Sequence, residues 1–350
     1  MRRAFCTVLL FAVAVHAHPG GIDSQGGHND RSAGTYHFHQ GPLDGQSFDS
    51  KDEATNALQG DTGEDSPPEL PAAPLPPVPQ GQIRLASWNI RIYSTGSRDD
   101  SELELIADRL QQFDLIAIQE LRDEDVVQRT LAILAARGEV YQAIVSEPVG
   151  RSVTERYAFY YRPDHIIPLD NGHIWPDTND EFIREPFFAS FKADQFDFTL
   201  ISVHVIFGDS IGDRRAENVL LDDVYRTVQD ADPNEQDVIL LGDFNLPPED
   251  QGMDEVDFLL DPVFSNVKTT ISDASLYDNF WWDSITEWTG ESGIDRFDEA
   301  VFGDDDGAAS LAVSDHRPIW VTFRTDVDDD GTNAPTSVRR RNWGGIKLGH

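Results

Sequence analysis

Cysteine is almost absent from this chain of 350 residues, because Cys6 is the only one. Cys6 lies inside an apolar N-terminal run that we expect to be removed on export, so the mature protein would contain neither a thiol nor a disulfide. A fold held together by disulfides is therefore excluded. Because 39% of the residues are hydrophobic and twenty are Phe, we expect a large buried core to stabilise the protein instead.

Positive charge is also scarce. The formal net charge is −36, from 63 acidic residues against 27 Lys and Arg. Lysine occurs only at Lys51, Lys192, Lys268 and Lys347. Tight, sequence-reading binding of nucleic acid needs local Lys and Arg against the phosphates, so this balance opposes it, although a catalytic encounter bridged by a metal ion is not opposed. The composition fits a saline exterior and an ordinary acidic secreted protein equally well.

The apolar run from Ala4 to Val15 is too short for a membrane anchor, since about twelve residues do not cross a bilayer of roughly 30 Å as a helix. It follows two arginines and ends in a small-x-small cleavage pattern at residues 15–17. We therefore predict a signal peptide over residues 1–17 and a mature chain that begins near His18. The protein is expected to be secreted, to the extracellular medium, the periplasm or the cell surface.

Composition divides the remaining chain into four segments. Residues 18–48 form a Gly- and His-rich module without hydrophobic periodicity, and residues 49–80 form an acidic, then Pro-rich linker that favours an extended tether. Over residues 81–325, strand-like runs alternate with helical ones, which predicts one α/β domain. Several runs there are apolar on both faces, which suggests strands inside a two-sheet sandwich covered by helices. Residues 326–350 read as a tail.

The tail begins with an acidic turn and ends in basic and aromatic residues. The turn matches the first positions of a calcium-binding loop through Asp326, Asp328, Asp330 and Gly331. Ser337 stands where such a loop requires a bidentate glutamate, so we do not predict a calcium hand. The basic end has three interpretations of similar weight: a signal for an export or surface-attachment system, a contact to nucleic acid phosphates, or a disordered end without a role.

Four short polar motifs stand at the ends of predicted strands in the 81–325 domain. They are Trp88-Asn89-Ile90-Arg91, Gln119-Glu120, Gly242-Asp243-Phe244-Asn245 and Ser314-Asp315-His316. Hydrolysis of a phosphodiester needs a Lewis acid, a base for water and stabilisation of the leaving oxygen. The oxygen ligands of Asn89, Glu120 and Asp315 suit a hard Mg²⁺, Mn²⁺ or Ca²⁺ ion. Each motif alone is equally typical of a solvated loop or a plain turn.

In their order and spacing, the four motifs resemble the endonuclease/exonuclease/phosphatase superfamily over nearly all of residues 81–324. Within it, the segments at 145–151, 155–157, 184–186 and 277–278 look like those of deoxyribonuclease I. The resemblance implies a four-layer α/β/β/α sandwich. It also implies roles at the site: Asn89 and Glu120 at the metal, Glu155 orienting His204, Asp278 orienting His316, and Asp243 with Asn245 positioning water and phosphate.

The chemistry of the side chains agrees with these implied roles. An imidazole with a pKa near 6.5 exchanges protons at working pH, and a carboxylate behind it fixes its tautomer, so His204 and His316 are the expected acid/base pair. His204 taken alone would fit a buried core histidine as well. Asp295 competes with Asp278 for the place behind His316, and we favour Asp278 because its distance from Asp315 fits the resemblance better.

Three arginines near the motifs are candidates for holding backbone phosphates through paired N–H donors: Arg122, Arg184 and Arg151. Surface ion pairs are the alternative for each. The chain departs from the family pattern in the loop before Glu155, where the expected Tyr corresponds to Val153 or Thr154. Minor-groove contacts by that loop are therefore not predicted, and the family's usual disulfides are missing.

The His-rich module resembles short bacterial YHYH-type segments that accompany extracellular nucleases, but Gly27 and Phe38 replace the two cysteines of such segments. The imidazoles of His28, His37 and His39 are candidate ligands for Zn²⁺ or a similar ion. A flexible His-rich linker explains the same residues equally well.

These observations predict a secreted, divalent-metal-dependent endonuclease that cuts DNA with little sequence preference, with DNA as its partner. A monomer without a stable protein partner is the expectation from the family. An alternative is a secreted phosphodiesterase or phosphatase for a lipid head group or another small phosphoester. An alternative of another class is a catalytically silent surface-binding protein, although every metal and proton-transfer residue expected from the resemblance is present in the sequence.

Overall fold

The computed structural model describes residues 27–30, 35–38, 47–48, 75–208, 210–232 and 235–329. The chain divides into two compact units, residues 1–67 and 68–350. The expected signal peptide (1–17), most of the linker, His39 and residues 330–350 of the tail lie outside the described residues.

The first unit contains an antiparallel sheet of three short strands, β1 (Gly27–Asp30), β2 (Thr35–Phe38) and β3 (Ser47–Phe48). The register of β1 and β2 sets the backbone of His28 opposite that of His37. Each of these strands is only two to four residues long, which is too short to produce a hydrophobic periodicity. The sequence of the Gly- and His-rich module therefore did not predict them.

The second unit is built on two mixed sheets. The seven-stranded sheet has the order β13-β14-β12-β11-β10-β8, with β9 also paired to β10. Its strands are β8 (Ile167–Pro168), β9 (His173–Ile174), β10 (Phe187–Ala193), β11 (Phe196–His204), β12 (Val238–Asp243), β13 (Asp261–Pro262) and β14 (Asp278–Trp282). The six-stranded sheet has the order β15-β16-β4-β5-β7-β6. Its strands are β4 (Gln82–Tyr93), β5 (Leu115–Leu121), β6 (Gln142–Val145), β7 (Arg156–Tyr161), β15 (Trp288–Ile294) and β16 (Ile319–Arg324).

The central strands are buried on both faces, because successive side chains point to opposite sides of a sheet. In β4, Leu85 belongs to the core between the two sheets, whereas Trp88 packs against the outer helices of its sheet. In β12, Leu241 faces the other sheet and Leu240 faces the helices on its own side. Strands of this kind have no polar face, which explains their continuous apolar runs.

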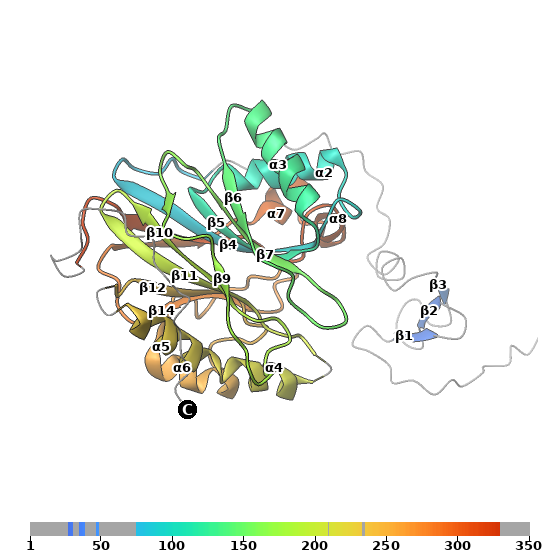
Figure 1. Ribbon diagram of the computed structural model, residues 1–350. Coiled ribbons are helices and arrows are strands. Elements are labelled where there is room, and N and C mark those ends of the chain that lie inside the picture. The colour runs from blue at the N-terminus through green and yellow to red at the C-terminus, as the bar shows by residue number, and fades with distance from the viewer. Residues whose placement is uncertain are drawn as a thin grey trace, which may run out of the picture. The chain divides into compact units, whose positions relative to one another are not determined.

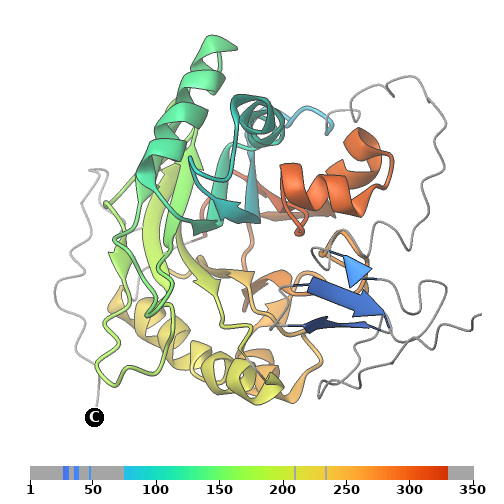
Figure 2. The same cartoon turned by 90° about the vertical axis from the view of Figure 1, so that its right-hand side faces the viewer.

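Helices cover both outer faces, as Figures 1 and 2 show. Against the six-stranded sheet lie α2 (Asp100–Leu110), α3 (Glu124–Ala136), α7 (Phe297–Phe302) and α8 (Asp306–Ala312). Against the seven-stranded sheet lie α4 (Ile211–Asn218), α5 (Leu221–Ala231), α6 (Asp254–Leu259) and the short 3₁₀ helix η1 (Gln251–Met253). The predicted four-layer α/β/β/α sandwich is therefore confirmed. In the described part of the chain, no helix has the length and apolar character needed to span a membrane.

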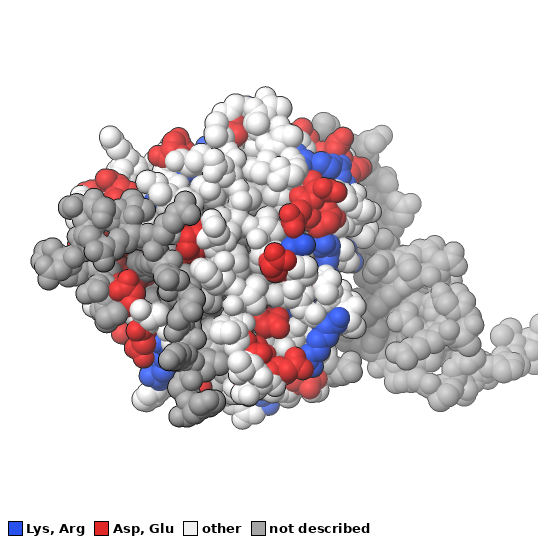
Figure 3. Space-filling view, viewed as in Figure 1, with Lys and Arg blue, Asp and Glu red and all other residues white. Residues whose placement is uncertain are grey.

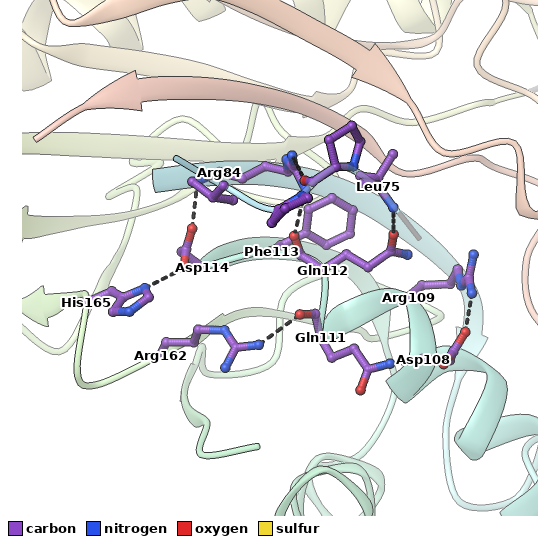
Figure 4. A pocket seen from close by; sticks show the side chains of 13 residues that line it. Leu75, Arg84, Asp108, Arg109, Gln111, Gln112, Phe113, Asp114, Arg162 and His165 are labelled. Carbon is purple, nitrogen blue, oxygen red and sulfur yellow. Dashed lines mark hydrogen bonds and ion pairs between the residues drawn. The ribbon is translucent and has the colours of Figure 1, made fainter. Parts of the chain in front are cut away.

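The last residues of the predicted linker contact the sandwich. The Leu75 amide donates to Gln112 Oε1 at 2.7 Å, and the Arg84 guanidinium donates to the Pro76 carbonyl at 2.7 Å. Figure 4 shows the pocket at this place, which Asp114 and His165 also line. The ordered contacts of the second unit thus begin several residues before Gly81, where the α/β domain was expected to start.

Candidate active site

The polar motifs meet because two pairs of parallel strands end at the same edge of the sandwich. In β4 and β5, Asn89 is in register with Gln119, and Glu120 follows directly. In β11 and β12, the last residues His204 and Asp243 are in register with each other. Gly242 makes this pairing sterically feasible, because its φ is +133° and a Cβ there would lie 2.1 Å from the Val203 carbonyl oxygen.

The polar side chains at this edge form one cluster, and Asn89 and Glu120 are its first part. Asn89 Nδ2 donates to Glu120 Oε1 at 3.2 Å and to Asp243 Oδ2 at 3.0 Å. Asn89 Oδ1 is buried and accepts no hydrogen bond from the described residues. Burial would raise the pKa of Glu120, but the charge of His204 and hydrogen bonds from the Ile92 amide and Asn89 lower it to about 2. An ionised carboxylate beside an unused amide oxygen fits a hard divalent cation.

His204 is held by a buried carboxylate. Its Nδ1 lies 2.5 Å from Glu155 Oε1, and its backbone amide donates to the Tyr157 hydroxyl at 3.1 Å. Its Nε2 faces the site, 3.8 Å from Asp243 Oδ2 and 4.0 Å from Glu120 Oε1. Burial lowers the pKa of His204, but the charge and hydrogen bond of Glu155 outweigh it and raise the pKa overall.

His316 repeats this arrangement from the opposite side. Its Nδ1 lies 2.8 Å from Asp278 Oδ2, and its Nε2 lies 3.7 Å from Asp243 Oδ2. Although burial opposes the charge, Asp278 and Asp243 raise the pKa of His316 well above its ordinary value. Asp295, the competing candidate, instead lies 3.6 Å from Arg109. Asp243 is thus shared by two imidazoles, each of which has its own carboxylate behind it.

Asp243 ends β12, and Asn245 lies in the turn that follows. Asn245 has a φ of +51°, and its amide donates to Asp243 Oδ1 at 2.9 Å. Asn245 Nδ2 donates to the Val205 carbonyl at 2.8 Å. Burial and the neighbouring carboxylate of Asp278 raise the pKa of Asp243, although both histidines oppose this. One ligand atom each of Asp243, Asp278 and His316 lies within 4.8 Å of the others, so this part of the cluster could also hold a metal ion.

The three predicted phosphate-binding arginines are not equivalent. Arg184 Nε lies 3.1 Å from Glu155 Oε2, and an Arg122 nitrogen lies 3.6 Å from the same oxygen. Both arginines therefore adjoin the cluster. Arg151 instead pairs with the exposed Asp180 at 3.1 Å, outside the cluster.

Asp315, the third expected metal ligand, is half-buried beside His316. Its negative charge contributes to raising the pKa of His316. Asp315 is not a member of the Asp243, Asp278 and His316 grouping that could hold an ion.

Sequence reasoning missed one arginine at this edge. The Arg214 guanidinium lies 3.6 Å from the ring centroid of Phe207, a ring that is 54% exposed. Arg214 also donates to the Asn245 carbonyl and the Tyr277 hydroxyl, each at 3.4 Å. Arg214 belongs to α4, where an arginine is indistinguishable in sequence from an ordinary surface residue. Only the tertiary structure brings it to the turn after β12.

The pocket in Figure 4 lies away from the candidate active site. It is lined by Arg84 and Asp114, near the first residues of β4 and β5. Asn89 and Glu120 stand toward the other ends of the same strands.

Figure 3 shows that, among the described residues of the face it presents, basic side chains lie beside acidic ones and form no broad basic patch.

Comparison with known proteins agrees with this geometry. The model of the Endonuclease/Exonuclease/phosphatase family matches residues 86–316. A deoxyribonuclease of Thioalkalivibrio sp. (strain K90mix) is 32% identical over 277 residues, which cover 74% of this chain and 76% of that protein. Deoxyribonuclease-1 of Homo sapiens is 35% identical over 176 residues, which cover 47% of this chain and 60% of the human protein.

Solved structures share the fold at lower identity. The crystal structure of D. rerio TDP2 complexed with single strand DNA product is 18% identical to this chain, with a TM-score of 0.50. The match covers 70% of this chain and 99% of that one. At such identity the likeness concerns the fold alone. The family match and the relatives named deoxyribonuclease show that the chain belongs to the endonuclease/exonuclease/phosphatase family and is a deoxyribonuclease I-like hydrolase.

Proposed function

We propose that the protein is a secreted, divalent-metal-dependent endonuclease that hydrolyses DNA phosphodiester bonds with little sequence preference. The observation that supports this most strongly is the pair of buried imidazole–carboxylate couples, His204 with Glu155 and His316 with Asp278, whose free nitrogens both approach Asp243. Two proton-transfer groups on opposite sides of one carboxylate suit a reaction in which one proton leaves water and another reaches the leaving oxygen.

Each histidine has a defined proton position in this proposal. Glu155 accepts from Nδ1 of His204, so Nε2 of the neutral ring is the free base. Asp278 does the same for His316. The pKa values of both histidines are raised, that of His316 well above its ordinary value, which favours His316 as the proton donor of the two. His316 is therefore the proposed acid, and His204 is the proposed base. Asp243 and Asn245 are proposed to position water and phosphate between the two rings.

Asn89, Glu120 and Asp315 are the proposed oxygen ligands of Mg²⁺ or Mn²⁺. When bound, the ion supplies Lewis acidity to a phosphoryl oxygen and offsets developing negative charge. Two observations support the choice of these residues: the pKa of Glu120 is low, and Asn89 Oδ1 accepts no hydrogen bond within the described part of the chain.

Contacts to the phosphate backbone are assigned to arginines. Arg122 and Arg184 adjoin the cluster through Glu155, and Arg214 adjoins Asn245. Arg151 is proposed only as an outer contact, because it already pairs with Asp180. Phosphate contacts position a duplex without reading its sequence, which is the reason for the expected weak sequence preference. Secretion is proposed on the N-terminal sequence, and Edman sequencing of exported protein that starts near His18 would support it.

Plasmid nicking tests the function. Purified full-length protein is incubated with supercoiled plasmid, Mg²⁺ and Ca²⁺, beside an EDTA control and the variants His204→Ala and His165→Ala. His165 is the matched control, since it pairs with Asp114 at the pocket of Figure 4. We expect nicking by the wild type and His165→Ala, and none in EDTA or by His204→Ala.

Intact plasmid in every lane would contradict the proposal. Hydrolysis of a choline phospholipid or an inositol phosphate by the same preparation would then support a small phosphoester substrate. DNA binding that persists in EDTA, without hydrolysis of any of these compounds, would instead indicate the silent binding protein.

A further inference from the structure

A phenylalanine is exposed at the edge of the candidate active site. Phe207 is 54% exposed and follows His204 by three residues, in the loop between β11 and α4. Single exposed apolar side chains are common on protein surfaces, so exposure alone indicates no function. Two further features distinguish Phe207: hydrogen bonds fix the backbone around it, and a cation lies against its ring.

The loop backbone is held on both sides of Phe207. Before it, the Ile206 amide donates at 2.8 Å to Oε2 of Glu217, which is 3% exposed. The backbone carbonyl of Phe207 itself accepts from Arg214 Nε at 2.7 Å. After it, Gly208 has a φ of +62°, and a Cβ there would lie 2.8 Å from a side chain of α4. The fold therefore sets the direction in which the Phe207 ring points.

Both ring neighbours of Phe207 lie on one side of it. The Arg214 guanidinium is 3.6 Å from the ring centroid of Phe207 and 6.0 Å from that of Tyr277. The two ring centroids are 6.5 Å apart, with an interplanar angle of 68°. These three distances place Arg214 and Tyr277 on the same side of the Phe207 ring. The opposite face accounts for the exposure of the side chain, so a flat molecule can lie against it within the described part of the chain.

Arg214 connects this ring to the candidate active site. Its guanidinium donates to the Asn245 carbonyl and to the Tyr277 hydroxyl, each at 3.4 Å. Tyr277 directly precedes Asp278, the partner of His316. A nucleotide beside the cleaved phosphodiester would therefore meet a guanidinium, which suits its phosphate, and an aromatic face, which suits its base. The guanidinium also stabilises the ring in place through a cation–π contact.

We propose that Phe207 stacks on an unpaired base of the substrate strand, so that it favours DNA with single-stranded segments. In a duplex, both faces of a base are covered by its neighbours, and a base must leave the helix before it can stack on a protein side chain. An unpaired base needs no such step. Because every base has a π-face, stacking on Phe207 would favour single strands without selecting a sequence. This inference rests on the proposed function, which makes DNA the substrate.

Binding of fluorescently labelled oligonucleotides tests the proposal without relying on cleavage. Each protein is full length and carries His204→Ala, so that Mg²⁺ can be present while the DNA stays intact. The probes are a single-stranded thymidine oligonucleotide, a blunt duplex and a chain of abasic deoxyribose phosphates, all of the same length. Fluorescence anisotropy gives each Kd. Adding Phe207→Ala should raise the Kd of the single strand by about 5- to 150-fold, the usual effect of removing one stacked aromatic. The Kd of the duplex should change by less than about twofold.

Two further variants serve as controls. Phe207→Tyr keeps an aromatic face and should bind the single strand within about threefold of the parent. Phe258→Ala removes another exposed phenylalanine, which is 84% exposed on α6. Soon after Phe258, Asp261 pairs with Trp282, at the opposite end of β14 from Asp278. Phe258→Ala should therefore leave every Kd unchanged. The abasic probe should bind equally weakly to the parent and to Phe207→Ala, because it offers no base to stack.

Three results would overturn the proposal: the parent binds the single strand no better than the abasic probe, Phe207→Ala keeps the single-strand affinity of the parent, or Phe207→Ala weakens duplex binding equally. Should Phe207→Ala fail to fold, Phe207→Leu decides the outcome, because it keeps an apolar side chain without an aromatic face. Cleavage by the protein with His204 intact is measured on the same probes. Binding that depends on Phe207, without cleavage of any probe in Mg²⁺, would support the stacking role and contradict the proposed nuclease function.

Discussion

Glu155→Gln is the substitution that most directly probes how the active site is built. Glu155 is 1% exposed, with Oε1 2.5 Å from His204 Nδ1 and Oε2 3.1 Å from Arg184 Nε. Both of its oxygens therefore face donors. A glutamine has only one oxygen, so its NH₂ group must face either the imidazole or the guanidinium.

Either orientation is unfavourable. If the NH₂ group faces His204, Nδ1 must accept a hydrogen bond, the proton moves to Nε2, and the ring can no longer act as a base at the site. If it faces Arg184, two donors oppose each other. In both orientations the half-buried Arg184 guanidinium loses its counter-charge. A wrong tautomer in a histidine–carboxylate pair lowers kcat by about 10⁴ in a serine protease, so we expect a loss of about 10²–10⁴ here.

Stability should fall as well, by about 3–5 kcal/mol, because one partner of a buried ion pair has been removed. The assay is steady-state cleavage of a fluorogenic duplex, read as kcat and KM separately, beside urea unfolding. Glu155 acts through His204, so kcat should fall with little change in KM, and Glu155→Asp should recover part of the rate by restoring the charge. Glu147→Gln, an exposed residue of the same loop, is the control. Cleavage by folded Glu155→Gln within about threefold of the wild type would refute this account.

Three further predictions concern the turn after β12, the substrate surface and the response to pH. Gly242→Ala should lower the free energy of unfolding by at least about 2 kcal/mol more than Gly81→Ala does. Both glycines have a positive φ, but only at Gly242 would the new Cβ lie 2.1 Å from a carbonyl oxygen. Equal losses for the two variants in urea unfolding would contradict this steric argument. Arg214→Ala should raise KM for DNA severalfold and reduce the slope of log KM against log salt by about one, with kcat little changed; an unchanged KM would remove Arg214 from the substrate surface. The pKa of His316 is raised in the folded protein, so in EDTA its ion pair with Asp278 stabilises the fold fully below about pH 6.5, the pKa of an unfolded histidine. This stabilisation is lost as the pH rises through the pKa of His316 in the folded protein. Calorimetry should therefore show Tm falling above neutral pH in the wild type and a flatter profile in His316→Gln.

The fold and most of the candidate site could be predicted from the sequence. Continuous apolar runs such as residues 238–241 have no polar face, so they indicate strands buried on both sides and hence a layered sandwich. The motifs that end these strands are local in sequence, and parallel strands deliver their ends to one edge. The resemblance to the family implied one site for Asn89, Glu120, His204 and Asp243, and the parallel strands give the physical reason why these residues are neighbours.

Tertiary structure alone decided which partners the side chains have. The sequence left both Asp278 and Asp295 open as the carboxylate behind His316, and only the path of the chain sets Asp278 at 2.8 Å and Asp295 beside Arg109. The sequence made Arg151 a candidate for binding phosphate and gave no role to Arg214, yet Arg151 pairs with Asp180 and Arg214 reaches Asn245. Sequence periodicity reports which face of an element is buried, but contacts between side chains distant in sequence depend on how the elements pack, and packing is a property of the whole chain.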